Sequence, residues 1–305
     1  MTATQHLISV SGGKDSTAVY LLALEAGRAF RAVFADTGNE HELTYEFIAT
    51  LHTKTGGPRV ETVRADFSEA LKRHKDFILQ EWSAQGMPDA IIREAADLHE
   101  PTGNPYLDLC ILKGRFPSRM AQFCTSELKE YPIVVQMVLP MLRNGPVLQW
   151  LGIRAEESLH RAKQPRFNHH ESGSMLWRPI FKWTIKEVWE QHRRHAINPN
   201  PLYAMGMRRV GCMPCINCRK SELSAISQLF PAHIERIARW EQLVGMASKR
   251  GASSFFAPIN GDILGIRQAT EWAKTGRGGR QYDLFFATQN FSGCSSDLAV
   301  CESSP

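Results

Sequence analysis

The chain has 305 residues, of which 43% are hydrophobic and 22% are charged, with a formal net charge of +5. These values are ordinary for a globular enzyme with a sizeable core, and the absence of any run near the ~18 apolar residues of a membrane span excludes a spanning helix. The opening MTATQHLISVSGG lacks the basic and apolar regions of a signal peptide. We therefore expect a cytoplasmic protein without membrane association. The modest positive charge fits a phosphate-bearing partner and, equally, a solvated basic face.

Short apolar runs alternate with longer amphipathic segments through the first 85 residues. This alternation predicts a repeated strand and helix unit, and hence a parallel sheet with helices on both faces. The predicted strands are His6–Val10, Arg31–Asp36 and Arg59–Asp66, and the predicted helices are Ser16–Ala26, Thr44–Thr55 and Ser68–Gln85.

The remaining chain is less regular. Many Pro and Gly residues in segment 87–119 indicate an irregular insertion over one end of the sheet. We place a domain boundary near residue 225, which separates a nucleotide-binding α/β domain (1–225) from a helical region with a mobile tail (226–305). The further predicted elements are a helix over Thr125–Leu142 with a break near Pro132, a strand from Val147, and helices over Thr184–Arg194, Pro231–Arg250 and Ile266–Thr275.

The block SGGKDS, residues 11–16, lies where the first strand meets the first helix. A glycine pair lets the backbone turn tightly and approach a ligand, and the N–H groups of the turn and helix start form a cradle for an anion. Serine hydroxyls and Lys14 add donors, so the block suits a pyrophosphate. The alternative is a tight turn whose lysine faces water. The spacing differs from the Walker A and Gly-x-Gly-x-x-Gly motifs.

This block resembles the PP-loop of the ATP pyrophosphatase superfamily, and the chain as a whole resembles the phosphoadenosine phosphosulfate (PAPS) reductase family within it. The resemblance implies a doubly wound parallel sheet of the adenine-nucleotide alpha-hydrolase type, with a smaller helical C-terminal region. It also implies binding of ATP or of an adenylylated nucleotide. The supporting segments are FADTGNEHELTYEF, GRFPSRMAQFCTSELKEYPI, LGIRAEESLHRA, WRPIFKWTIKEVW and NPLYAMGMRRVGCMPC.

The resemblance also assigns roles to matching residues. The loop would hold phosphate or sulfate oxygens, the end of the second strand would border the nucleotide, and a later arginine-rich turn would line the reacting end. Asp36 could instead cap a helix, and Arg161 could lie on the surface. The implied nucleotide-binding residues are Ser11, Gly12, Gly13, Lys14, Asp15, Ser16, Asp36, Thr37, Gly38, Arg154 and Glu157, and the implied catalytic residues are Lys14, Arg154, Arg161 and Cys301.

Three cysteines in the run GCMPCINC have C-x2-C-x2-C spacing, which lets their sulfurs converge on one metal centre. Cys124 is the best fourth ligand, because its segment resembles one that carries cluster cysteines in iron–sulfur members of the family. We therefore expect a [4Fe–4S] cluster on Cys124, Cys212, Cys215 and Cys218. Zinc on the same residues and unligated buried thiols are the alternatives. The distribution departs from adenylylsulfate (APS) reductases, which pair an adjacent Cys-Cys with a later C-x-x-C.

The C-terminal tail carries Cys294 and Cys301. Sulfonucleotide reductases use a tail cysteine in a Glu-Cys-Gly-x-x-His context, and neither cysteine here is followed by Gly and His. Either thiol could attack sulfur from a mobile tail, or both could be incidental. Cys110, in LDLCILK, is expected to be a packed apolar residue.

Two enzymatic functions follow from these features. The first is a PP-loop sulfurtransferase, which uses ATP and Mg²⁺ to adenylate an acceptor such as a nucleic acid and takes sulfur from a donor protein. The second is an assimilatory PAPS or APS reductase, which forms sulfite through a tail cysteine and thioredoxin. The missing tail signature favours the first, and the matching segments favour the second. A nucleotide-binding module without activity is a third reading, and a homo-oligomer is compatible with all three.

Overall fold

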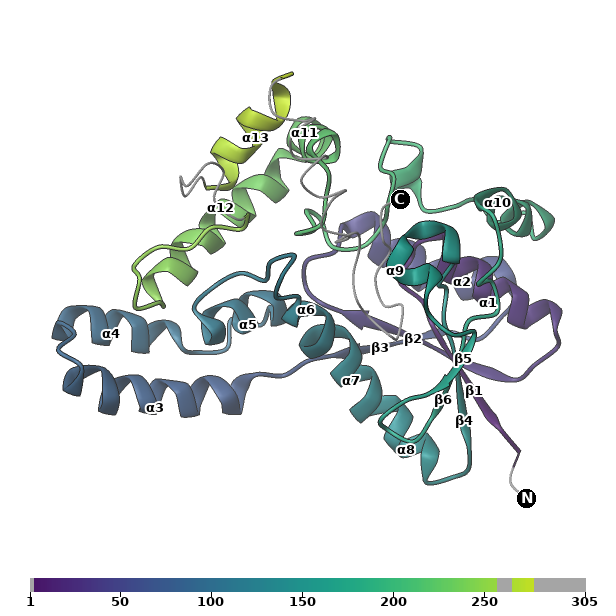
Figure 1. Cartoon of the computed structure of the whole chain (residues 1–305), viewed down its shortest axis with the longest axis horizontal. Helices are drawn as coiled ribbons and strands as arrows, with labels where there is room; N and C mark the ends of the chain where they lie inside the picture. The colour runs from purple at the N-terminus through teal and green to yellow at the C-terminus, as the bar shows by residue number, and fades with distance from the viewer. Residues whose placement is uncertain (1–2, 257–264, 277–305) are drawn as a thin grey trace.

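The computed structural model describes residues 3–256 and 265–276, and its central feature is a six-stranded sheet. The strand order is β3-β2-β1-β4-β6-β5, with five parallel strands and an antiparallel β5 at one edge. The fold therefore has the predicted doubly wound α/β class (Figure 1). The strands are β1 (Gln5–Ser9), β2 (Phe30–Asp36), β3 (Val60–Arg64), β4 (Val147–Trp150), β5 (Phe167–His169) and β6 (Met175–Trp177).

Successive side chains of β1 point to opposite faces of the sheet, and both faces are buried. Ile8 packs in a cluster with α1 (Lys14–Glu25), α2 (Glu42–Thr55) and α10 (Ile185–Arg194). Leu7 packs in a second cluster on the other face, against the helical segment 123–142. Because both residues are fully buried, the middle of β1 has no solvent-facing side, which is why it reads as a continuous apolar run.

The helical segment 123–142 remains helical through two prolines. It consists of α6 (Phe123–Thr125), α7 (Tyr131–Ile133) and α8 (Leu139–Leu142), joined by wider π-helical turns at Ser126–Glu130 and Val134–Val138. A proline lacks an N–H group and its ring clashes with the carbonyl four residues earlier. A π turn before Pro132 and another before Pro140 accommodate this clash. The break predicted near Pro132 is therefore a change of helical pitch.

Segment 87–119, predicted to be irregular, contains two helices. Together with α3 (Ser68–Ala84), α4 (Asp89–Leu98) and α5 (Pro105–Lys113) form a helical lobe beside the sheet (Figure 1). Proline at the first position favours a helix start, and the Asn104 side chain accepts a hydrogen bond from the Leu107 N–H group at 3.1 Å. The prediction of an irregular segment is wrong here, because Pro105 begins a helix.

The described C-terminal helices are α11 (Lys220–Leu229), α12 (Pro231–Met246) and α13 (Ile266–Lys274). Their apolar side chains share one cluster with α5 and with residues 212–218, which we call the cysteine segment. This cluster includes the stacked rings of Tyr106 and Trp240, whose centroids lie 5.7 Å apart. Separate folding of residues 226–305 stays a prediction.

In the described part of the chain, every helix is too short or too polar to cross a bilayer. Three short turns complete the chain path: Ala155–Glu157, α9 (Leu159–Ala162) and Pro201–Tyr203.

Candidate functional site

The loop of residues 11–16, which we call the phosphate loop after its predicted role, is a closed turn between β1 and α1. The Ser11 N–H group donates to the Ser16 hydroxyl at 3.0 Å, and that hydroxyl donates to the Gly13 carbonyl at 3.1 Å. Gly12 has a φ of +76°, and a Cβ atom there would lie 2.9 Å from a methyl group of Thr44. Only glycine fits this position without strain. Because α1 begins at Lys14, the loop directs helix-terminal N–H groups toward the carboxyl edge of the sheet, where an anion is stabilised.

Charges around the loop form a buried, alternating chain. Lys14 Nζ lies 3.1 Å from Asp15 Oδ2, and Arg154 Nε lies 2.5 Å from Asp15 Oδ1. Burial alone would raise the pKa of Asp15, but the charges of Lys14 and Arg154 outweigh it and hold that pKa below its usual range. Asp15 therefore stays ionised at neutral pH and fixes both cations. Lys14, which the sequence analysis predicted to be a phosphate ligand, is buried and paired with Asp15.

The turn after β4 extends this charge chain. Glu157 accepts from the Arg154 N–H group at 2.8 Å and from Arg161 Nη1 at 2.7 Å. Burial raises the pKa of Glu157, although Arg161 opposes the shift. The structure thus brings Arg154, Glu157 and Arg161 together beside the phosphate loop, and all three are buried. Their nucleotide-binding and catalytic roles remain predictions.

Gly152 is a site residue that sequence reasoning missed. A Cβ atom at Gly152 would lie 2.8 Å from the Ser16 backbone nitrogen and 2.9 Å from the Asp15 carbonyl carbon. Both contacts are with backbone, so the phosphate loop would have to move. The signal available in the sequence was a glycine directly after a buried strand, within LGIRAEES.

Tyr203 connects the phosphate loop to the cysteine segment. Its hydroxyl accepts a hydrogen bond from the Lys14 N–H group at 2.9 Å, at the start of α1. His192 Nε2 lies 2.8 Å from the Lys14 carbonyl oxygen, which secures the same residue from α10. Tyr203 thus occupies a donor that the loop would offer to a phosphate oxygen. Nothing in the sequence of NPLY indicates this contact.

The loop after β2 forms the second half of the site. Asp36 Oδ1 accepts from the Gly38 N–H group at 2.8 Å and from the Tyr45 hydroxyl at 2.7 Å. Its Oδ2 atom pairs with Arg64 Nη2 at 2.8 Å. Asp36 therefore shapes the turn at Thr37 and Gly38. The predicted contact of these three residues with a nucleotide stays a prediction.

The cysteine segment is bound directly to this loop. The Met213 N–H group donates to the Asn39 carbonyl at 2.7 Å, and Asn39 Nδ2 donates to the Pro214 carbonyl at 3.0 Å. Cys212 pairs with Glu40 as an isolated antiparallel bridge. The Cys212 sulfur lies 3.6 Å from the Thr37 hydroxyl and 3.6 Å from a Glu40 carboxyl oxygen. These contacts place the first thiol of the C-x2-C-x2-C run at the carboxyl edge of the sheet.

Three of the four predicted metal-binding thiols share one buried environment. Burial raises the pKa of Cys212 to about 12 and that of Cys124 to about 11, and Cys215 adds to both shifts. Burial opposes the charge of Lys129, but Cys212 and Glu40 outweigh it and raise its pKa. The fourth thiol, Cys218, is buried beside Cys215. With these raised pKa values, Cys212 and Cys124 would be protonated at neutral pH. They would bind a metal only if the metal displaces their protons.

The described cysteines leave the nature of the metal centre a prediction. Sulfurs bound about 2.3 Å from one zinc ion lie about 4 Å apart. Within the described residues, no three cysteine sulfurs lie within 4.8 Å of one another. A [4Fe–4S] cluster and zinc on the same four cysteines both stay predictions. Cys110 is buried, as expected for a packed residue. Cys294 and Cys301 lie outside the described residues.

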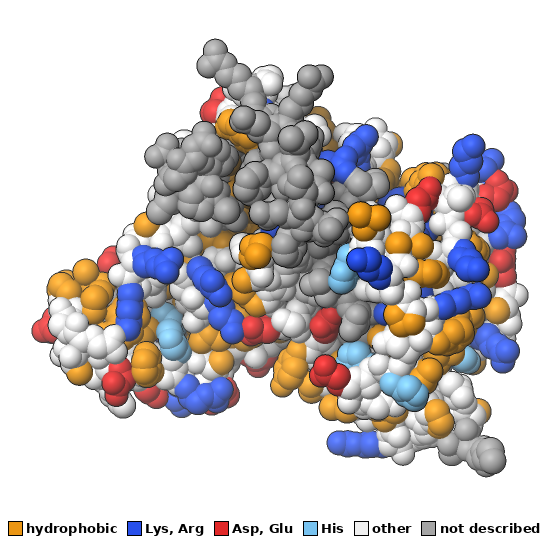
Figure 2. Space-filling model, in the orientation of Figure 1, with side chains coloured by type: hydrophobic (Ala, Val, Ile, Leu, Met, Phe, Trp, Pro, Cys, Tyr) orange, Lys and Arg blue, Asp and Glu red, His pale blue; other side chains and the backbone are white. Residues whose placement is uncertain are grey.

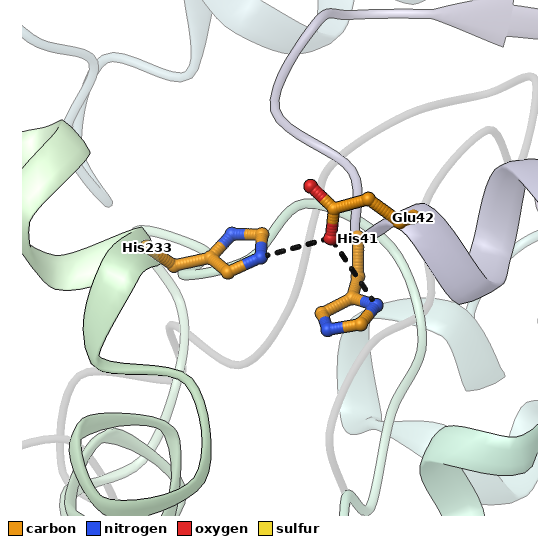
Figure 3. Close-up of side chains that lie close together, drawn as sticks. All are labelled: His41, Glu42 and His233. Atoms are coloured by element: carbon orange, nitrogen blue, oxygen red, sulfur yellow. Dashed lines mark hydrogen bonds and ion pairs between the residues drawn. The ribbon is translucent and has the colours of Figure 1, made fainter.

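A histidine pair joins α2 to α12 next to the cysteine segment (Figure 3). The ligand atoms of His41, Glu42 and His233 lie within 4.8 Å of one another. His233 Nδ1 lies 2.9 Å from Arg236 Nη2 and 3.3 Å from the Met213 carbonyl oxygen, and its Nε2 lies 3.2 Å from Glu42. His41 Nδ1 accepts from the Leu43 N–H group at 3.0 Å. These contacts make the cluster a hydrogen-bonded connection between α2 and α12.

The fold and loop define a doubly wound α/β protein with a tight glycine turn at its first strand–helix junction. The sequence profile of the phosphoadenosine phosphosulfate reductase domain matches residues 5–218, and the chain belongs to that family. An uncharacterized 37.8 kDa protein from Escherichia phage 186 is 41% identical and aligns with 98% of this chain and 97% of its own length.

Two characterised proteins are similar over different lengths. Adenosine 5'-phosphosulfate reductase from Allochromatium vinosum is 38% identical over 65 residues, which cover 21% of this chain and 25% of that enzyme. The phosphate complex of phosphoadenylyl-sulfate (PAPS) reductase from Candida auris matches with a TM-score of 0.41 and 17% identity, over 70% of this chain and 84% of that one.

We expect Gly152→Ala to weaken nucleotide binding, because the added methyl group would displace the backbone of Ser16. Isothermal titration with ATP and with PAPS measures the effect, and we expect affinity to fall at least tenfold, on the order of 1.4 kcal/mol. The control is Gly276→Ala, where a Cβ atom meets nothing within 4 Å. Equal affinities for both variants and the unmodified chain would contradict the assignment of the loop.

We expect the free energy of unfolding to fall as the pH is lowered from about 7.5 to about 5.5. Burial lowers the pKa values of His41 and His233 below 6.5, and Arg236 adds to both shifts. The unfolded chain therefore binds more protons in the window below 6.5, which favours unfolding there. Urea denaturation should show a smaller pH dependence for His233→Gln, and an unchanged one for the exposed His160→Gln. A slope that His233→Gln leaves intact would contradict the assignment.

Proposed function

We propose that this protein is a PP-loop sulfurtransferase that adenylates an acceptor with ATP and transfers sulfur to it, with a nucleic acid as acceptor. The observation that carries the proposal is that one segment contacts both the phosphate loop and the loop after β2, at one edge of the sheet. Tyr203 binds the phosphate loop, and the cysteine run that follows it binds the loop after β2. An anion cradle and a buried thiol set are thereby held by one continuous segment, 200–218.

The loop supports the first half of such a reaction. Its helix-terminal N–H groups and the Lys14 and Arg154 cations would stabilise the leaving pyrophosphate when an acceptor oxygen attacks the α-phosphorus of ATP. Asp15 holds both cations in place before the nucleotide arrives. Displacement of the Tyr203 hydroxyl from the Lys14 N–H group would couple nucleotide binding to the segment that carries the cysteines.

The thiols support the second half. Cys124, Cys212, Cys215 and Cys218 would hold a [4Fe–4S] cluster, which when bound supplies a site for activating sulfur. Lys129 would offset part of the negative charge of the four thiolates, because it is buried and its pKa is raised. The sulfur itself would come from a protein persulfide, whose terminal sulfur would displace AMP from the adenylated acceptor. A second thiol of the donor would then cleave the S–S bond and form a disulfide with the donor cysteine, which supplies the two electrons.

We expect anaerobically purified protein to contain about four iron and four sulfide per chain. Cys215→Ser should lower iron and sulfide several-fold and remove the visible absorbance of the cluster. Cys110→Ala is the matched control, because Cys110 is buried but outside the predicted ligand set, and it should retain full iron. A colourless protein with one zinc ion and no sulfide would exclude the cluster.

A second candidate function is a sulfonucleotide reductase, favoured by the family and by the similarity to adenosine 5'-phosphosulfate reductase. It would require Cys301 or Cys294 to attack the sulfur of PAPS or APS, after which thioredoxin would release sulfite.

One experiment separates the two candidates. The protein is given ATP and Mg²⁺ with and without single-stranded DNA or RNA, and separately PAPS or APS with thioredoxin. We expect pyrophosphate release that requires the nucleic acid, with no sulfite. Sulfite formation that Cys301→Ser or Cys294→Ser abolishes would replace the sulfurtransferase with the reductase.

A further inference from the structure

The helical lobe contains a cavity of about 770 Å³ away from the phosphate loop. It lies between α3, the turn after α5 and the segment after α12, and we call it the lobe cleft. Four exposed cations line it, namely Lys113, Arg115, Lys249 and Arg250, together with His74 and without any Asp or Glu among the described lining residues. In Figure 2, Lys and Arg side chains and a histidine are visible on the lobe at the left of the view.

The positive charge of the lobe cleft is largely uncompensated. Lys113 pairs with Glu127 at 2.8 Å, and Lys249 donates to the amide of Gln85. Among the described residues, Arg115 and Arg250 make no ion pair with a carboxylate. A cavity with free guanidinium groups and no acids favours a ligand with several negative charges.

Aromatic rings line the same cavity. Phe77 is 45% exposed, and its ring stacks on His74 with centroids 5.7 Å apart and an interplanar angle of 17°. Phe256 is half-buried in the lining, and the buried Phe116 and Phe255 lie beneath. An exposed ring and a half-buried ring next to cations without carboxylate partners suit bases joined by phosphates, because bases stack on rings while the cations contact the backbone. An acidic peptide would use the cations and leave the rings unexplained.

Two residues that line the lobe cleft also contact the residue that precedes Cys124. The Phe123 ring lies 5.9 Å from Lys113 Nζ and 5.7 Å from the Arg115 guanidinium carbon. The next residue in the chain is Cys124. A strand bound in the lobe cleft would therefore run beside the segment that carries the first predicted cluster ligand.

We propose that the lobe cleft binds single-stranded nucleic acid and holds the acceptor strand of the sulfur transfer. The inference rests on the proposed function for its purpose, but binding itself requires neither ATP nor a cluster. A single strand is favoured over a duplex because a cavity of this size admits unstacked bases, whereas a duplex presents its backbone and hides its base faces.

The test measures fluorescence anisotropy of a labelled oligodeoxythymidine of about 12 nucleotides with the full chain and no ATP, within the roughly 4–16 nucleotides typical of such sites. We expect Arg115→Gln/Arg250→Gln to weaken binding at least about tenfold and to flatten the salt dependence by roughly 0.7 for each phosphate that is no longer neutralised. Phe77→Ala should weaken binding at least about fivefold.

The matched control is Arg59→Gln/Arg143→Gln, which removes the same charge from exposed positions just before β3 and β4, at the opposite edge of the sheet. Circular dichroism and melting temperature establish that the variants fold. The control should bind within about twofold of the unmodified chain. Equal weakening in both double variants, no binding by the unmodified chain, or equal binding of duplex DNA or polyglutamate would overturn the proposal.

The outcomes separate the two proposals. Oligonucleotide binding that depends on Arg115 and Arg250, without nucleic-acid-dependent pyrophosphate release, would support the lobe cleft and reject the sulfurtransferase. Pyrophosphate release stimulated by oligonucleotide to the same extent in Arg115→Gln/Arg250→Gln as in the unmodified chain would support the sulfurtransferase and reject the lobe cleft.

Discussion

The pairing of Asn39 and Glu40 with the cysteine segment is the contact on which the site depends. It joins residues about 175 positions apart, and it brings the turn after β2 and the cysteine segment to one edge of the sheet. Ligands of open α/β sheets bind at this edge, because helix starts and strand ends expose their backbone groups there. Together with the Tyr203 contact to Lys14, this pairing fixes the position of the cysteine segment relative to the phosphate loop.

The buried charges of the site form two separate groups. Asp15 pairs with both Lys14 and Arg154 beside the phosphate loop, and Lys129 lies next to Glu40 among the thiols. Burial of unpaired ions is expensive, so each group must be complete before a ligand arrives. A nucleotide would therefore meet cations that Asp15 already orients, and thiols that lose their protons to a metal would have the Lys129 cation beside them. The lobe cleft differs, because its exposed arginines remain unpaired within the described residues.

Sequence patterns predict the strands and helices well where local signals are strong. The first three strands, the helices between them, and the helices beginning at Pro231 and Ile266 lie close to the predicted bounds. Two predictions that rest on proline are wrong. Pro105 begins a helix instead of breaking one, and the helical segment 123–142 absorbs Pro132 through a π turn. In both cases the outcome depends on packing, since a proline is tolerated wherever its missing hydrogen bond is already unmade or a wider turn is held by the core.

The sequence by itself determined the family resemblance, the α/β class, the anion-binding block SGGKDS and the cysteine run, because each depends on residues close together in the chain. Only the tertiary structure decided that Gly152 must lack a side chain, that Tyr203 binds the phosphate loop, and that Lys129 lies among the thiols. These contacts join segments whose separation in sequence carries no local signal. They exist because parallel strands, connected through long crossovers, bring their carboxyl ends to a common edge.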